Sequence, residues 1–187
     1  MFDQIITSLY QLTYLVKNDI IFSQISYEKD DFMQKIFVPG SYDPFHNGHL
    51  ELVRFASQNF ESVIVGVANP EHKTKRFSRD QMMIAMAEVF EQHNFSNIDI
   101  VKYEEPMPEV VVELKADCIL RGFRSEKDIP YEVANYEKWK KSPVKLPPVI
   151  YVYAPFTSST YIYNLLKQGK LEDARKLVPL PVFNLIK

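Results

Sequence analysis

Two histidines follow an aspartate–proline pair in residues 40–49, whose sequence is GSYDPFHNGH. His46 and His49 are three positions apart, so in the first turn of a helix both side chains lie on one face. The start of a helix also offers free backbone N–H groups, and imidazoles beside them can stabilise phosphate oxygens that gain charge during a reaction. We therefore predict a phosphate-binding turn with His46 and His49 as catalytic groups. Zinc binding is the alternative, but only Asp43 stands nearby as a further ligand.

A basic loop and a hydroxyl-rich stretch add further groups suited to phosphate. Residues 69–76 have the sequence NPEHKTKR and include Lys73, and residues 157–160 have the sequence TSST and precede a predicted helix. Hydroxyl and N–H groups at the start of a helix bind phosphate oxygens. The ordinary alternatives are a solvated charged loop for the first stretch and a simple helix cap for the second.

Two arginines flank a glycine at the expected end of another strand. Arg121 and Arg124 stand on either side of Gly122, and arginine carries a fixed fork of N–H donors that matches phosphate geometry. The alternative is a surface ion-pair network, in which Asp128 and Glu132 neutralise the arginines.

Short apolar runs alternate with helical stretches from residue 35 onward. The predicted strands are residues 35–38, 62–68, 98–102, 117–120 and 149–153, and the predicted helices lie near residues 48–59, 78–92, 108–115, 131–141, 159–167 and 171–177. This alternation indicates a doubly wound, Rossmann-like α/β domain with a five-stranded parallel sheet. Ligands of such sheets bind at the carboxyl ends of the strands. Four of the five predicted strands are followed there by groups suited to phosphate.

The composition bounds the classes of protein that the chain fits. The 187 residues are 46% hydrophobic and 25% charged with a net charge of -2, which indicates one globular domain without the basic excess of a nucleic-acid or membrane partner. Cys118 is the only cysteine, so no intramolecular disulfide forms. No apolar run approaches the ~20 residues of a membrane span, and the first residues lack a basic start and a small-residue cleavage site. We therefore expect a cytoplasmic protein.

The first 34 residues differ from the rest of the chain. Apolar side chains recur at helical spacing between residues 2 and 16, which predicts an amphipathic helix. We therefore divide the chain into an N-terminal extension, residues 1–34, and a main domain, residues 35–187.

The run His46-Asn47-Gly48-His49 resembles the H-x-G-H motif of the nucleotidyltransferase superfamily. Within it, the chain most resembles the bacterial phosphopantetheine adenylyltransferase family. Residues 121–132 resemble that family's R-G-x-R…D-x-x-Y-E segment, residues 40–44 resemble its G-[ST]-F-D-P opening with Tyr42 at the aromatic position, and residues 158–160 resemble its S-S-[ST] run. The resemblance covers residues 35–165.

The resemblance implies transfer of AMP from ATP, with Mg²⁺, to 4′-phosphopantetheine, giving dephospho-coenzyme A and pyrophosphate by direct in-line attack. It implies three overlapping sets of site residues and no protein ligand for a metal. The catalytic set is His46, His49, Lys73 and Arg121; the acceptor set is Ser41, Tyr42, Lys73, Met107 and Arg121; the ATP set is Ser41, His49, Arg121, Gly122, Arg124, Glu132, Ser158, Ser159 and Thr160. It also implies a homo-oligomer, commonly a hexamer in bacterial members.

The chain departs from the family pattern at two usually basic positions, which are Met82 and Tyr163 here. Other activities of the superfamily share part of the motifs. A nicotinate mononucleotide adenylyltransferase fits the His46–His49 run and residues 158–160 equally well, but not the arginine segment, and a cytidylyltransferase ranks behind it for the same reason. A non-catalytic nucleotide-binding protein is a further alternative, which only substrate turnover separates from the enzymes.

Overall fold

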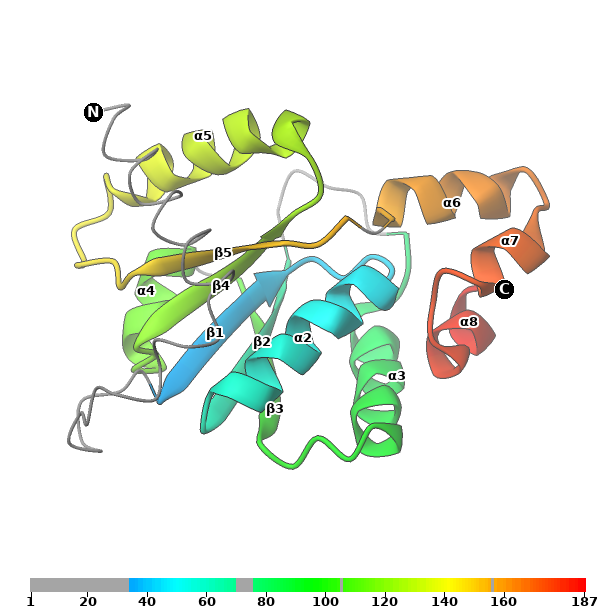
Figure 1. Cartoon of the computed structure of the whole chain (residues 1–187), viewed down its shortest axis with the longest axis horizontal. Coiled ribbons are helices and arrows are strands. Elements are labelled where there is room, and N and C mark those ends of the chain that lie inside the picture. Colours follow the sequence, from blue (N-terminus) through cyan, green and yellow to red (C-terminus); the bar gives the residue numbers. More distant parts are fainter. Residues whose placement is uncertain (1–33, 70–75, 105, 156) are drawn as a thin grey trace, which may run out of the picture. The chain divides into compact units, whose positions relative to one another are not determined.

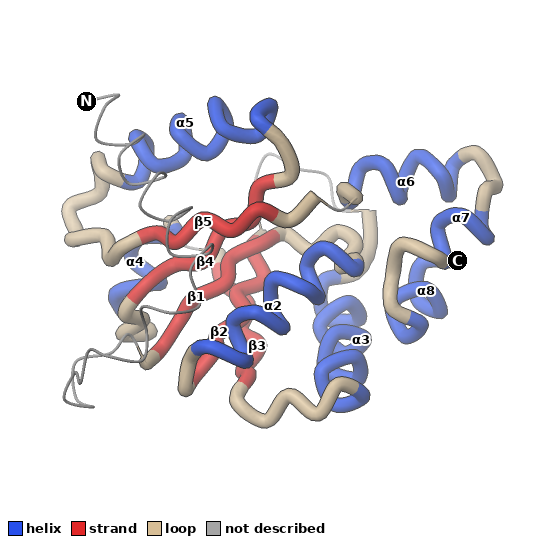
Figure 2. Tube along the Cα trace, viewed as in Figure 1, coloured by secondary structure: helices blue, strands red, loops and turns tan. Residues whose placement is uncertain are grey.

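The computed structural model describes residues 34–69, 76–104, 106–155 and 157–187. Five strands form one sheet (Figures 1 and 2): β1 Lys35–Gly40, β2 Ser62–Ala68, β3 Ile98–Tyr103, β4 Cys118–Phe123 and β5 Val149–Tyr153. All neighbouring strands are parallel, and their order is β3-β2-β1-β4-β5. The predicted doubly wound parallel sheet is confirmed.

Helices connect the strands and follow the last of them. They are α2 Asn47–Asn59, α3 Arg79–Gln92, α4 Met107–Glu113, the 3₁₀ helix η2 Glu126–Asp128, α5 Ile129–Trp139, α6 Ser159–Lys167, α7 Leu171–Arg175 and α8 Leu180–Ile186. The sequence did not predict η2 or α8. Pro181 argues against a helix there, yet proline is tolerated in the first turn, where its missing N–H group would have no partner. The helix predicted within residues 2–16 lies outside the described residues.

Strands β1 and β2 are buried on both faces, which fits their largely apolar sequences. Ile36 and Val38 face one layer of the core, which contains side chains of α2, α3 and the last three helices. Phe37, between them, faces the other layer, which contains Val110 and Val111 of α4. Among the described residues, no helix is long and apolar enough to cross a membrane.

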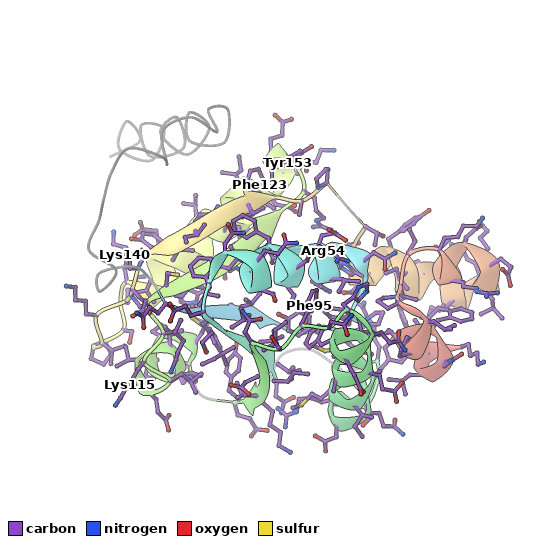
Figure 3. All side chains as sticks on the ribbon, turned by 60° about the horizontal axis from the view of Figure 1, so that its bottom comes forward. Arg54, Phe95, Lys115, Phe123, Lys140 and Tyr153 are labelled. Carbon is purple, nitrogen blue, oxygen red and sulfur yellow. The ribbon has the colours of Figure 1, made fainter. Side chains whose placement is uncertain are left out.

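The order of the strands reverses between β1 and β4. The chain runs outward from β1 to β3, returns to the other side of β1 to form β4, and continues to β5. In such sheets the helices diverge at this switch point and leave a crevice at the carboxyl ends of the two central strands. Figure 3 shows Phe123 and Tyr153 side by side at the ends of β4 and β5, and their ring centroids are 5.4 Å apart.

Candidate functional site

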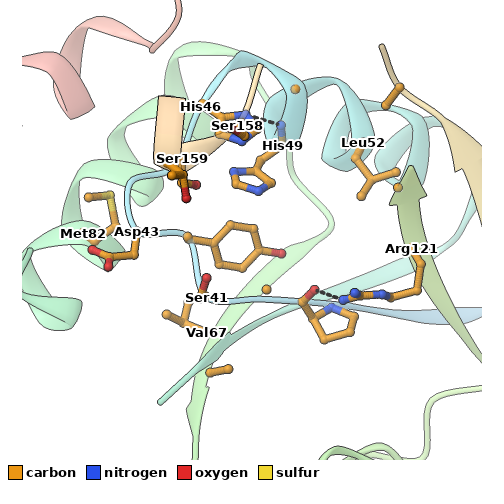
Figure 4. A pocket seen from close by; sticks show the side chains of 18 of the residues that line it. Ser41, Asp43, His46, His49, Leu52, Val67, Met82, Arg121, Ser158 and Ser159 are labelled. Carbon is orange, nitrogen blue, oxygen red and sulfur yellow. Dashed lines mark hydrogen bonds between the residues drawn. The ribbon is translucent and has the colours of Figure 1, made fainter. Parts of the chain in front are cut away.

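A pocket of about 1100 Å³ opens at the carboxyl ends of β1 and β4 (Figure 4). Segments far apart in the sequence line it: the turn after β1, the first turn of α2, the segment before α3, the end of β4 and the start of α6. Its described lining carries the cationic side chains of Arg76, Arg79, Arg121, Arg124 and Lys138, and one carboxylate, that of Asp43. The pocket is therefore suited to an anionic ligand, although the whole chain has a net charge of only -2.

His46 and His49 lie against each other at the base of the pocket. His46 is the N-cap of α2, and its Nδ1 atom accepts a hydrogen bond from the backbone N–H of His49 at 3.3 Å. The two rings stack with centroids 3.6 Å apart. Because Nδ1 of His46 is an acceptor, the neutral ring of His46 carries its proton on Nε2.

Both imidazoles are held in the neutral form. Burial, followed by the charge of Arg124, lowers the pKa of His46 to about 3. Burial also lowers the pKa of His49 well below its usual value, with smaller contributions from His46 and Arg124. The Nδ1 atom of His49 is buried without a hydrogen-bond partner among the described residues. Since an unpartnered buried polar atom is costly, this nitrogen is a natural contact for a ligand.

The turn between β1 and α2 is fixed by Tyr42 and Asp43. Tyr42 has φ 46°, in the left-handed region that a bulky residue rarely adopts, and its hydroxyl donates to the Val38 carbonyl at 2.7 Å. Its ring meets that of His49 edge-on, with centroids 4.9 Å apart. A Cβ atom on Gly40 would lie 2.7 Å from the Tyr42 ring, so this position admits only glycine. Tyr42 therefore packs against His49 and helps to fix its ring.

Asp43 ties the turn to the segment that precedes α3. Its two carboxylate oxygens accept the backbone N–H groups of Arg76 at 3.1 Å and Phe77 at 3.0 Å. From the sequence, Asp43 was a candidate only as a zinc ligand, and both of its oxygens are engaged in these bonds. Its role in the described structure is to hold the two segments together.

The two predicted arginines at the end of β4, Arg121 in the strand and Arg124 just after it, are both paired with carboxylates of the following helical segment. Arg121 binds Glu132 through two hydrogen bonds of 2.7 and 2.9 Å and donates to the Pro39 carbonyl at 3.2 Å. Arg124 binds Asp128 through side-chain bonds of 2.7 and 3.0 Å. The ion-pair network that the sequence left as an alternative is therefore present, but Arg121 and Arg124 also line the pocket.

The start of α6 closes the other side of the pocket. Ser158 caps the helix by accepting the backbone N–H of Tyr161 at 3.1 Å, and the Ser159 hydroxyl donates to the Pro44 carbonyl at 2.9 Å. The Thr157 hydroxyl oxygen is buried without a partner among the described residues. The simple helix cap is thus present, and the same turn faces the pocket.

An apolar region of the pocket lies beside β3. Met107 begins α4, is buried against Phe37 and Val111, and lines the pocket together with Tyr103. Arg79, nearby in the lining, pairs with Glu104 at 2.9 Å, and its Nη1 atom is buried without a hydrogen-bond partner among the residues that the structure describes. This region can accept a ligand that combines an apolar chain with polar groups.

Most of the predicted site residues meet at this pocket. Its lining includes Ser41, Tyr42, His46, His49, Met107, Arg121, Gly122, Arg124, Ser158, Ser159 and Thr160. Glu132 is buried behind Arg121 instead, and Lys73 lies outside the described residues. Arg76, Arg79 and Lys138 also line the pocket but were not predicted as site residues from the sequence. Arg76 ends the basic run already noted, and Arg79 precedes Met82 by three positions, so helical spacing could have found it.

The two departures from the family pattern have clear places in the structure. Met82 is 2% exposed, and its sulfur accepts the Phe45 backbone N–H at 3.5 Å. The Tyr163 ring contacts two cations, with the Arg76 Cζ atom 4.7 Å and the Lys167 Nζ atom 5.1 Å from its centroid. Met82 therefore packs the core, and Tyr163 supports a cation of the pocket.

In the described parts of the chain, no three His, Cys, Asp or Glu side chains gather into a metal site. The one carboxylate of the described lining, Asp43, has both oxygens bonded to backbone N–H groups. This lining fits a metal ion that arrives with a polyphosphate. Such an ion takes most of its ligands from phosphate and water, as Mg²⁺ commonly does.

Sequence comparison places the chain among known proteins. A model of the cytidylyltransferase-like family matches residues 37–165. The phosphopantetheine adenylyltransferase of Leptospira biflexa is 34% identical over 139 residues, covering 71% of this chain and 83% of that protein. The Haemophilus influenzae protein of the same name is 30% identical over 161 residues, covering 83% and 99%.

Structural comparison supports the fold. A putative nicotinate-nucleotide adenylyltransferase from Vibrio parahaemolyticus has a TM-score of 0.60 at 16% identity and covers 82% of this chain and 99% of its own. Thermotoga maritima TmcAL, bound with alpha-thio ATP, has a TM-score of 0.55 at 15% identity and covers 82% and 55%.

A cationic pocket with two neutral histidines at the switch point of a parallel sheet defines a nucleotidyltransferase-type α/β protein. The chain belongs to the cytidylyltransferase-like family, and the curated relatives that it matches are named phosphopantetheine adenylyltransferases. The family resemblance predicted from the sequence is confirmed.

Proposed function

We propose that the protein transfers the adenylyl group of ATP to 4′-phosphopantetheine, giving dephospho-coenzyme A and pyrophosphate. One observation carries the proposal: the His46–His49 pair lies in one cationic pocket between Arg121, on β4, and the start of α6. The names of the relatives supply the acceptor. The apolar region at Met107 suits the pantetheine arm, and the arginines suit two phosphorylated substrates.

In the proposed mechanism, an oxygen of the acceptor phosphate forms a bond to the α-phosphorus of ATP. The bond from that phosphorus to the bridging oxygen breaks, and its electrons leave with pyrophosphate. No covalent enzyme intermediate is needed, so positioning and electrostatic stabilisation carry the catalysis.

The residues divide between the two substrates. His49 stabilises charge on the α-phosphate. His46 orients His49 through ring stacking and through the hydrogen bond that caps α2. Ser41, Tyr42, Lys73, Met107 and Arg121 hold the acceptor. Gly122, Arg124 and residues 158–160 hold ATP together with Ser41, His49 and Arg121. Glu132, assigned to ATP from the sequence, acts here by fixing the Arg121 guanidinium.

Enzymes of this kind use ATP with a divalent metal ion, and we propose Mg²⁺. Bound to the phosphate oxygens, the ion would neutralise part of the charge of the leaving pyrophosphate. The hydroxyls of Ser41 and Ser158, both in the pocket lining, are neutral oxygens that can meet its water shell.

We also propose a cytoplasmic homo-oligomer, with a hexamer as the form to test. The single cysteine suits a reducing compartment. Exposed apolar side chains on α5 support self-association: Ile129, Val133 and Tyr136 are 41%, 39% and 38% exposed. Light scattering coupled to gel filtration measures the mass of the particle in solution directly. A monomer at micromolar concentration would contradict the proposed homo-oligomer.

Pyrophosphate release tests the activity. The full-length protein is incubated with Mg²⁺ and either ATP or CTP, with 4′-phosphopantetheine or nicotinate mononucleotide as acceptor. Release with ATP and phosphopantetheine alone is the expected result. Release with another pair replaces the substrate assignment, and no release from folded protein in any arm favours a nucleotide-binding protein without turnover.

A further inference from the structure

Arg76 joins three parts of the pocket that are distant in the sequence. Its Nη1 atom donates to the Asp43 carbonyl oxygen in the turn after β1 at 3.3 Å, and its Nη2 atom donates to the Thr160 hydroxyl in α6 at 3.2 Å. The guanidinium carbon lies 4.7 Å from the centroid of the Tyr163 ring, also in α6. The side chain is thus fixed beside the first turn of α6, in the lining of the pocket.

The charge of Arg76 differs in its surroundings from that of the other arginines in the pocket. Arg79, Arg121 and Arg124 each form a salt bridge with a carboxylate. In the described part of the chain, Arg76 forms no salt bridge, and its side-chain partners are a carbonyl, a hydroxyl and an aromatic ring. These contacts orient the guanidinium without neutralising it. Its guanidinium therefore lines the pocket without a salt-bridged carboxylate among the described residues.

The position of Arg76 relative to the histidines indicates which part of a substrate it meets. In Figure 4, Ser159 at the start of α6 and Arg121 on β4 lie on opposite sides of His49. In-line transfer places the attacking oxygen and the leaving group on opposite sides of the reacting phosphorus. With the acceptor phosphate at Arg121 and the α-phosphate at His49, pyrophosphate leaves on the side of α6, where Arg76 is anchored.

We propose that Arg76 binds the β- and γ-phosphates of ATP and stabilises the pyrophosphate as it leaves. This inference rests on the proposed adenylyl transfer. Arg76 takes the place of a basic side chain on α6, where this chain has Tyr163, and the Tyr163 ring holds the guanidinium through a cation–π contact. As the bond to the α-phosphorus breaks, negative charge grows on the bridging oxygen, and a fixed guanidinium lowers the free energy of that state.

Steady-state kinetics of Arg76→Gln and Arg76→Lys in both directions of the reaction test this role. In the forward direction we expect Arg76→Gln to lower kcat/KM for ATP by about 10- to 100-fold, the usual effect of losing a hydrogen bond to a charged group. The KM for phosphopantetheine should stay unchanged. In the reverse direction the KM for pyrophosphate should rise while that for dephospho-coenzyme A does not. Arg76→Lys should retain part of the activity, because it keeps the charge and loses the fork.

Two further variants separate a ligand contact from a structural role. Lys167→Gln is the matched control, because Lys167 contacts the same Tyr163 ring but does not line the pocket, and its kinetics should match the wild type. Arg76→Gln combined with Tyr163→Lys returns a cation to the same place and should recover part of the lost kcat/KM for ATP. A double variant that recovers nothing would assign Arg76 to holding the turn and overturn the proposal.

Failure of this inference can be told apart from failure of the proposed function. Wild-type kcat/KM for ATP in Arg76→Gln, or a KM for phosphopantetheine that rises as much as the KM for ATP, overturns the role of Arg76 while the transferase activity stands. A wild-type protein without turnover refutes the proposed function instead. In that case, calorimetric titration of wild type and Arg76→Gln with pyrophosphate still decides: weaker binding by the variant supports the site, and equal binding overturns it.

Discussion

The Arg121 guanidinium and the Glu132 carboxylate form a two-pronged pair, with Nη2 2.7 Å from Oε1 and Nε 2.9 Å from Oε2. The side chains are only 18% and 9% exposed, so neither charge is well solvated. Burial alone would lower the pKa of Arg121, but the hydrogen bonds and charge of Glu132 raise it above the ordinary value. The pair keeps Arg121 charged. It also fixes the guanidinium in the pocket lining, where it donates to the Pro39 carbonyl of β1.

We expect Glu132→Gln to destabilise the fold and weaken the acceptor site together. Removing one partner of a buried pair leaves an uncompensated charge, at a cost of about 3 kcal/mol or more in the free energy of unfolding. Urea denaturation measures this cost. Asp128→Asn is the matched control, because it breaks the more exposed pair with Arg124 and should cost below about 1 kcal/mol. Equal costs in the two variants would contradict the difference in burial.

His49→Ala should abolish most turnover without unfolding the protein. Loss of a preorganised donor to developing charge typically costs about 3 kcal/mol, or roughly 10²-fold in kcat. Initial rates at saturating ATP and acceptor measure the effect, and circular dichroism checks the fold. His93→Ala, a change at an exposed residue that follows α3, should turn over like the wild type. Near-normal kcat in His49→Ala would remove this residue from the mechanism.

Stability should fall as the pH is lowered from 6.5 towards 5. The unfolded chain protonates His46 near its usual pKa of about 6.5, whereas the folded chain holds the pKa at about 3. In this window the unfolded state therefore binds more protons, and acid favours unfolding by about 2 kcal/mol at pH 5 from His46 alone. His49, whose pKa is also lowered, adds to the loss.

His46→Asn isolates the contribution of His46, because asparagine can still cap α2. The free energy of unfolding of this variant should drop about 1.5 kcal/mol less than that of the wild type between pH 6.5 and pH 5. Denaturant titrations at the two pH values provide the comparison. Identical pH dependence in both proteins would show that His46 is not held neutral.

Met107→Ala should impair use of the acceptor more than use of ATP. Met107 lies in the apolar region of the pocket, so shortening it removes contacts with the pantetheine arm. We expect a severalfold rise in the KM for phosphopantetheine, since each buried methylene contributes about 0.8 kcal/mol, with the KM for ATP unchanged. Val112→Ala, at an exposed position of the same helix, is the control. A rise confined to the KM for ATP would reverse the assignment.

The sheet was predictable because buried parallel strands are continuously apolar, as residues 62–68 are. The contact between His46 and His49 was predictable because their spacing is local to one helical turn. The closing helix α8 was not predicted, and it begins with Pro181 in its first turn, where proline is tolerated. The division of the chain at residues 34 and 35 stays a prediction.

The partners of the pocket residues could not be predicted, because they depend on how distant elements pack. Nothing local in the sequence states that Arg76 bonds to Thr160, which follows it by 84 positions. Likewise, the sequence offers Glu132 as an ATP ligand or as an ion-pair partner with equal ease, and only the placement of α5 beside β4 brings it to Arg121. Spacing predicts contacts within one turn, whereas contacts across the pocket require the fold.

The most direct test follows the α-phosphorus of ATP. The protein is incubated with Mg²⁺, 4′-phosphopantetheine and ATP labelled at the α-phosphate, and the products are separated. The account predicts that the label appears in dephospho-coenzyme A, with one unlabelled pyrophosphate released per labelled product. Label that stays in ATP, or that appears as free AMP while the acceptor is unchanged, would contradict it.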